Sequence, residues 1–161
     1  MELVSEEGDT IGLVSRAEAH SDASYLHRVV HVLVFDEQGR LLVQKRSMNK
    51  DVGPGLWDVS VGGHVIPGEL PLEAAYREMK EELGIEFVDL HFLYDHIFYG
   101  EEESEFVSTY ECTYTGKIFF DHDEIEAIRL MDFEEIDGQL GKHVFTEHFE
   151  QEYVLYQELS S

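Results

Sequence analysis

The chain has 161 residues, of which 43% are hydrophobic and 12% aromatic, and its formal net charge is −24. This composition favours a single globular domain and disfavours a disordered chain. The acidic excess disfavours nucleic acid and anionic membrane surfaces as partners. No apolar run is long enough to span a membrane, and the single Cys112 favours a reducing, cytoplasmic compartment. The acidic surplus fits either metal binding or solubility, and composition leaves both open.

The first third of the chain is predicted to form strands. Two apolar stretches around Glu7-Gly8-Asp9 predict an N-terminal β-hairpin, which with the following loop makes an extension over residues 1–26. β-Branched runs at 28–35 and 40–46, joined by the turn DEQG, predict two further strands. The segment LWDVSV at 56–61 predicts another short strand.

A helix is predicted from Pro71 to Leu83, because apolar residues recur there every three or four positions. Proline suits the first helical turn, and Gly84 suits the position just past the end. The expected apolar stripe consists of Leu72, Ala75, Met79 and Leu83.

The rest of the chain is predicted to contain strands near 91–99, 104–114, 117–120 and 126–131, followed by an amphipathic helix at 145–159. Strands with helices before and after them predict an α/β fold in layers around a mixed sheet. Residues 1–161 are expected to form one domain. The sequence does not reveal the oligomeric state.

Three glutamates of the predicted helix, Glu78, Glu81 and Glu82, lie on an exposed side away from its apolar stripe. Like charges one turn apart destabilise a bare helix by roughly a few tenths of a kcal/mol. A divalent cation reverses this effect, and carboxylate oxygens suit Mg²⁺ or Mn²⁺. The alternative is an ordinary solvated helix face.

The stretch 63–85 resembles the Nudix box at every position of its pattern. The matching residues are Gly63, Glu69, Arg77, Glu78, Met79, Glu81, Glu82, Gly84 and Ile85. The resemblance implies the Nudix α/β/α sandwich and attack of metal-activated water on a diphosphate linkage. It implies Glu78, Glu81, Glu82 and the Gly63 carbonyl as metal ligands, with Glu81 and Glu82 catalytic. It further implies that Arg77 orients the glutamates and that Glu69 supports the loop.

Segments outside the box resemble the Nudix-type isopentenyl-diphosphate isomerases. The segments AHSDASYLH, SVGGH and ESE imply a second metal site for Mn²⁺, Zn²⁺ or Mg²⁺, made of His20, His27, His64, Glu103 and Glu105. Singly, each of these residues could instead be an ordinary polar residue. The resemblance fails at Gly62, because the isomerases carry a cysteine there to protonate an alkene. Cys112 lies in a predicted strand and is expected in the core.

Two further roles are expected close to the box. Arg46 and Lys50 match positions that contact the diphosphate in the isomerase-like branch, although they could also form a solvated strand end. A general base must reach the metal-bound water. Glu124 and Glu126 are candidates, Glu105 is their rival, and spacing does not choose among them.

The sequence therefore predicts a hydrolase that depends on Mg²⁺ or Mn²⁺, with a second transition metal such as Zn²⁺. Its expected substrate is a small molecule with a diphosphate linkage, such as a nucleoside diphosphate linked to another moiety. The alternatives are an isopentenyl-diphosphate isomerase-like enzyme and a non-catalytic Nudix module that binds a ligand. The organic part of the substrate is not readable from the box.

Overall fold

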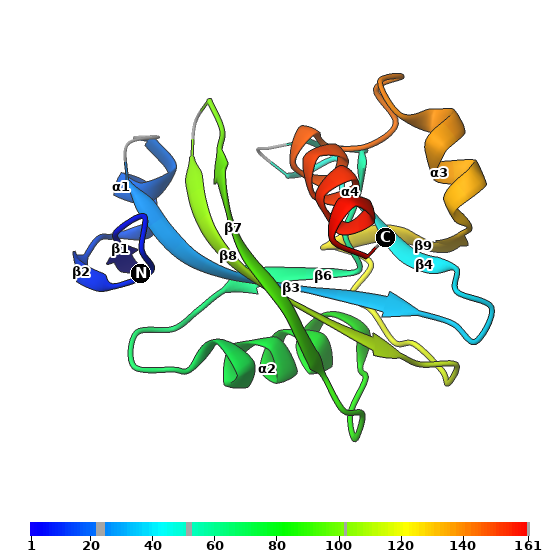
Figure 1. The fold of residues 1–161 in the computed structure, drawn as a ribbon, viewed down its shortest axis with the longest axis horizontal. Coiled ribbons are helices and arrows are strands. Elements are labelled where there is room, and N and C mark those ends of the chain that lie inside the picture. Colours follow the sequence, from blue (N-terminus) through cyan, green and yellow to red (C-terminus); the bar gives the residue numbers. More distant parts are fainter. Residues whose placement is uncertain (22–24, 51–52, 102, 161) are drawn as a thin grey trace.

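The computed structural model describes residues 1–21, 25–50, 53–101 and 103–160, with the side chains of residues 16, 20 and 21 outside the description. A nine-stranded mixed sheet lies between helix α2 on one face and helices α3 and α4 on the other (Figure 1). This is the predicted α/β/α sandwich. Among the described helices, none is long and apolar enough to cross a membrane.

Strand β3 (Leu26–Phe35) forms the centre of the sheet. It pairs in parallel with β8 (Ser104–Thr113) over its whole length, and β8 pairs with β7 (His91–Tyr99). Its other edge pairs antiparallel with three strands, which are β1 (Glu2–Val4), β6 (Val61–His64) and β4 (Leu41–Arg46). The remaining strands are β2 (Thr10–Leu13) beside β1, and both β5 (Trp57–Asp58) and β9 (Ile125–Met131) beside β4.

Helix α2 (Pro71–Leu83) covers one face of the sheet and has the predicted bounds. Gly84 follows it with φ +67°, a left-handed conformation that glycine adopts without strain. The helix packs on the core through Ala74, Ala75, Met79 and Leu83. The predicted apolar stripe is wrong at Leu72, which is 42% exposed. Leu72 has the right angular position, but it lies in the first turn, before the part of the helix that reaches the core.

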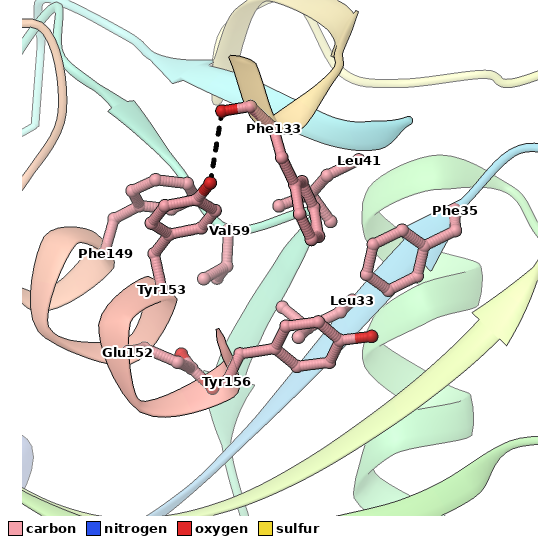
Figure 2. A pocket seen from close by; sticks show the side chains of 9 residues that line it. All are labelled: Leu33, Phe35, Leu41, Val59, Phe133, Phe149, Glu152, Tyr153 and Tyr156. Atoms are coloured by element: carbon pink, nitrogen blue, oxygen red, sulfur yellow. Dashed lines mark hydrogen bonds between the residues drawn. The ribbon is translucent and has the colours of Figure 1, made fainter. Parts of the chain in front are cut away.

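Helices α3 (Phe133–Gln139) and α4 (Glu147–Ser160) cover the opposite face. Their aromatic side chains surround a small apolar pocket in which Glu152 is the only charged lining residue (Figure 2). The Tyr153 hydroxyl donates a hydrogen bond of 3.2 Å to the Phe133 carbonyl and so joins the two helices. The C-terminal helix was predicted from the sequence. It begins after Thr146, whose hydroxyl accepts a hydrogen bond from the Phe149 N–H.

The predicted strand at 56–61 is two strands in the structure, β5 and β6, with different neighbours. The Ser60 side chain explains the break between them. Its hydroxyl accepts a hydrogen bond from the Val34 N–H at 2.9 Å and donates one to the Leu42 carbonyl at 2.5 Å. A side chain that bonds to backbone groups of both β3 and β4 interrupts regular pairing at its own position.

The predicted strand at 117–120 is wrong, since these residues form no strand. The Phe119 N–H instead donates a hydrogen bond to the Leu83 carbonyl, so the segment lies against the C-terminal end of α2. The N-terminal hairpin is confirmed as β1 and β2. A short helix, α1 (Arg16–Ser21), lies within the expected loop, and neither α1 nor α3 was predicted. Cys112 is buried, as expected.

Candidate active site and histidine cluster

Strand β6 presents successive residues to opposite faces of the sheet. A Cβ placed on Gly63 would point toward α2 and meet Glu78 Cδ at 2.2 Å. A Cβ placed on Gly62 would point toward the other face and meet His31 Cδ2 at 3.2 Å. The strand thus separates the residues of the Nudix-like box on the α2 face from a set of histidines and carboxylates on the α4 face.

Arg77 connects the box residues to one another. Its guanidinium contacts Glu69 at 2.8 and 3.0 Å, and it contacts Glu78 at 2.7 Å and Glu81 at 3.2 Å. It also donates to the His64 carbonyl at 2.9 Å, which ties α2 to β6. Hydrogen bonding from Arg77 lowers the pKa of Glu69. One partly buried cation therefore fixes the loop before the helix and orients two of the three glutamates.

Glu82 is largely buried, and the expectation of a wholly exposed acidic face is wrong for this residue. Its Oε1 accepts a hydrogen bond of 2.9 Å from Gln44 Nε2. Burial raises the pKa of Glu82 well above its usual range, and the neighbouring charge of Glu78 adds to this effect, while the bond from Gln44 opposes it. Glu81 is instead largely exposed, with a side chain that is 59% accessible.

These carboxylates fit a hard divalent cation. Glu78 and Glu82 are held close together in a poorly hydrated position, where two negative charges are costly unless a positive charge joins them. Carboxylate and backbone oxygens are the ligands that Mg²⁺ and Mn²⁺ prefer. The missing Cβ of Gly63 is what allows Glu78 to lie against β6. Glu78, Glu82 and the Gly63 carbonyl remain predicted ligands.

The histidine group consists of His27, His64, Glu103 and Glu105, whose possible ligand atoms all lie within 4.8 Å of one another. His27 Nε2 lies 3.5 Å from Glu105 Oε2 and 4.0 Å from Glu103 Oε2. The parallel register of β3 and β8 sets His27 beside Glu105, and the pairing of β3 with β6 brings His64 to the same face. The side chain of His20, the fifth predicted member, lies outside the described residues.

A second cluster follows directly on the first, and sequence analysis missed it. His148 Nδ1 lies 3.2 Å from Glu105 Oε1, while His148 Nε2 lies 3.0 Å from His96 Nε2. His31 packs against His148 with 4.8 Å between ring centroids, and its Nδ1 lies 2.5 Å from Glu152 Oε2. We call His31, His148 and Glu152 the inner group, and their possible ligand atoms also lie within 4.8 Å of one another.

Glu152 of the inner group is held by three hydrogen-bonding partners. Besides His31, the Thr109 hydroxyl donates to its Oε1 at 2.7 Å and the Tyr94 hydroxyl at 3.3 Å. Burial by itself raises the pKa of Glu152, but the charge and hydrogen bond of His31 outweigh it and lower the pKa to about 2. Burial likewise tends to lower the pKa of His31, and Glu152 raises it to about 9. Without metal, the pair is therefore an imidazolium–carboxylate ion pair.

Two spacings in the sequence could have pointed to these residues. His31 follows His27 by four positions in a strand, which places both on one face. His148 and Glu152 are also four apart, on one side of a helix. Neither spacing shows which residues of β3, β8 and α4 meet in space. Among the residues that the structure describes, the histidine and inner groups are the two metal-ligand clusters of this kind, and the box glutamates are more dispersed.

The predicted phosphate-binding cations occur in ion pairs. Arg46 lies 3.6 Å from Asp58, and Lys50 pairs with Glu124, one of the candidate general bases. The other candidates are also paired, Glu126 with Lys45 at 3.8 Å and Glu105 with two histidines. The geometry disfavours Glu105, which lies on the α4 face away from the box, and it does not choose between Glu124 and Glu126.

Comparison with known proteins agrees with this architecture. The crystal structure of DR0079 from Deinococcus radiodurans superposes with a TM-score of 0.82 at 26% identity, covering 93% of this chain and 94% of that one. The fold and the residues on α2 therefore define a Nudix-type α/β/α protein. A family model described as NUDIX domain matches residues 25–152. The chain belongs to the NUDIX domain family.

Two kinds of relative share parts of the sequence. The isopentenyl-diphosphate Delta-isomerase of Streptomyces avermitilis is 48% identical over 85 residues, which are 53% of this chain and 43% of the relative. A Nudix hydrolase of Listeria innocua, lin0387, named as uncharacterised, is 52% identical over 60 residues, or 37% of this chain and 36% of the relative. The chain thus matches less than half the length of either relative.

Proposed function

We propose that the protein is a hydrolase that uses Mg²⁺ or Mn²⁺ to cleave a diphosphate linkage in a small molecule. A nucleoside diphosphate linked to another moiety is the favoured substrate class. The observation that carries this proposal is the close, poorly hydrated pair of Glu78 and Glu82 against Gly63. The complete box spacing supports it. The single, buried Cys112 supports the expected cytoplasmic compartment.

The side chains have separate roles in this proposal. Glu78, Glu81 and Glu82 hold the ion, which when bound neutralises the diphosphate and acidifies water. Arg77 keeps Glu78 and Glu81 in place through the contacts described above. Glu124 accepts the proton of the attacking water, since Glu105 lies on the opposite face of the sheet from the box. Arg46 and Lys50 exchange their carboxylate partners for substrate phosphate.

Product analysis tests this function. Purified protein with Mg²⁺ or Mn²⁺ is incubated with nucleoside diphosphates, nucleotide sugars and dinucleotides, and released phosphate and nucleotides are separated and measured. We expect turnover of at least one compound and its loss in EDTA. Activity that survives EDTA, or no turnover across the panel, would count against the proposal.

We also propose that the histidine group binds a transition metal such as Zn²⁺ or Mn²⁺. Imidazole nitrogens favour these ions over Mg²⁺. The N···O separations around His27, 3.5 and 4.0 Å, suit donors arranged about a common centre. Elemental analysis should find transition metal in the wild-type protein and less in His27→Ala. Equal contents in the two proteins after reloading at neutral pH would contradict this site.

An isomerase-like activity is the second candidate, favoured by the histidine group and by the Streptomyces relative. It is opposed by Gly62, which has no acidic proton to give to an alkene. Appearance of dimethylallyl diphosphate from isopentenyl diphosphate would favour this candidate over hydrolysis. A non-catalytic ligand-binding module is opposed by the complete box, and it would show binding of a diphosphate without product.

A further inference from the structure

The polar residues of the α4 face contain more ligand atoms than one metal ion uses. The histidine and inner groups meet at Glu105, whose two oxygens face different partners. Oε2 lies 3.5 Å from His27 Nε2, and Oε1 lies 3.2 Å from His148 Nδ1. Two ligands that each lie about 2.1 Å from one ion are about 3.0 to 3.5 Å apart. Both separations therefore have the size expected for ligands of a shared ion, one on each side of Glu105.

We propose that the inner group holds a second transition-metal ion next to the ion of the histidine group, with Glu105 bridging the two. Its ligands are His31 Nε2, His148 and Glu105 Oε1. Carboxylate-bridged pairs of ions in hydrolytic enzymes are about 3.5 to 4 Å apart. The inference rests on the histidine group binding metal, and it does not depend on which reaction the protein catalyses.

Glu152 is assigned to the second sphere of this ion. Its distance of 2.5 Å from His31 Nδ1 is too short for two ligands of one ion and is that of a hydrogen bond. A histidine that binds metal through one ring nitrogen usually donates its other N–H to a carboxylate, which fixes the ring. Thr109 and Tyr94 fix Glu152 in turn. An ion on His31 Nε2 leaves this arrangement unchanged.

Gly62 lies beside the proposed metal-binding nitrogen of His31. The ring edge of His31 that carries Cδ2 and Nε2 faces Gly62, and a Cβ there would lie 3.4 Å from Nε2. A side chain at this position would press on the ring edge that carries the nitrogen and displace it.

Metal counting tests the proposal without measuring turnover. Stripped protein is reloaded with Zn²⁺ in excess Mg²⁺, desalted and measured by elemental analysis. His31→Ala and Gly62→Ala should each lower the Zn²⁺ content roughly twofold, since each removes one of two ions. The exposed His91→Ala is the matched control and should keep the wild-type content. His27→Ala should reduce the content independently of the inner group.

Electron paramagnetic resonance of Mn²⁺-loaded protein gives a second readout. Wild-type protein should show a spin-coupled pair, and Gly62→Ala should show isolated ions only. Circular dichroism verifies folding, and Gly62→Ala serves as the test variant if His31→Ala does not fold. A wild-type content of one ion per chain, or an unchanged content in Gly62→Ala, would overturn the second ion. No transition metal in the wild type would overturn the histidine-group site as well, while hydrolysis at the box could still be present.

Discussion

Gly63 lies directly against Glu78, so close that a Cβ on the glycine would come within 2.2 Å of the carboxyl carbon. Arg77, the preceding residue of α2, also holds Glu78 Oε1 at 2.7 Å. The glycine is therefore required by the position of a side chain and not by an unusual backbone angle. This contact explains physically why a glycine and a glutamate fifteen positions apart belong to one site.

Gly63→Ala should displace Glu78 and lower kcat by roughly a hundredfold, because a shift of about 1 Å in a catalytic group has this effect. Overpacking should also reduce the free energy of unfolding by about 1 to 3 kcal/mol. Steady-state kinetics on a substrate found in the panel and urea unfolding measure the two effects. Gly138→Ala is the control, since no atom lies within 4 Å of its new Cβ. If both variants keep full activity, the Gly63–Glu78 contact has no functional role.

Glu82→Gln should lower kcat by at least roughly a hundredfold through loss of a metal ligand. The same change should raise the melting temperature of the metal-free protein at neutral pH. Burial and Glu78 raise the pKa of Glu82, so the fold loses stability as the pH rises from the unfolded pKa of this group through its higher folded pKa. Gln44 can still donate to the new amide oxygen. The melting temperature of the variant should therefore be higher than that of wild type in EDTA and lower than that of wild type with Mg²⁺. Near-wild-type activity would show that the metal binds elsewhere.

The sequence predicts well what depends on local spacing. The bounds of α2 follow from Pro71, Gly84 and the apolar period between them, and the box residues lie on one segment. The sequence does not predict which side chains from distant segments contact one another. Glu82 looks exposed on an isolated helix, but Gln44, 38 positions earlier, covers it. Solvation of a side chain is a property of the packed layers and not of helix periodicity.

The inner group was missed for the same reason. His31 reads as one residue of a buried strand, and His148 and Glu152 read as the polar side of a C-terminal helix. Only the packing of α4 across β3 and β8 joins them. The break at Ser60 likewise depends on two backbone groups in other strands, those of Val34 and Leu42. These contacts have high sequence separation, so no pattern within a short window contains them.

Wild-type protein should form no dimethylallyl diphosphate from isopentenyl diphosphate, because Gly62 cannot supply a proton. Product chromatography with a known isomerase as positive control measures this. Product formed in proportion to enzyme, and lost after mutation of one residue, would contradict our assignment of the chemistry.

Restoring the cysteine is predicted to be costly. In Gly62→Cys the new Cβ lies 3.2 Å from His31 Cδ2, so the buried ring must shift. We expect the free energy of unfolding to fall by about 1 to 3 kcal/mol, as for other overpacked sites. Urea unfolding of metal-free protein measures the change. An equally stable variant would show that His31 has room to move. Packing against His31 would then not be the reason for a glycine at position 62.

The turn between β3 and β4 should make stability depend on pH through Asp36. Its Oδ1 accepts hydrogen bonds from the N–H groups of Gln38 at 3.0 Å and Arg40 at 2.8 Å, and its Oδ2 accepts one from Arg40 Nε at 2.6 Å. Burial tends to raise the pKa of Asp36, but the bonds from Arg40 and Gln38 outweigh it and lower the pKa below 3.8. A carboxyl group with a lowered folded-state pKa stabilises the fold above its unfolded pKa, and this contribution is lost as the pH falls through the folded value.

Asp36→Asn should therefore be less stable than wild type at pH 7, and the difference should shrink as the pH falls below 3.8. Urea unfolding midpoints measured across this range at low protein concentration test the prediction. Glu37→Gln removes an exposed charge from the same turn, and its midpoint should stay close to that of wild type at pH 7. The opposite result would be a difference between Asp36→Asn and wild type that grows toward acid pH. It would mean that the folded turn favours the protonated form of Asp36, which contradicts the hydrogen bonding described here.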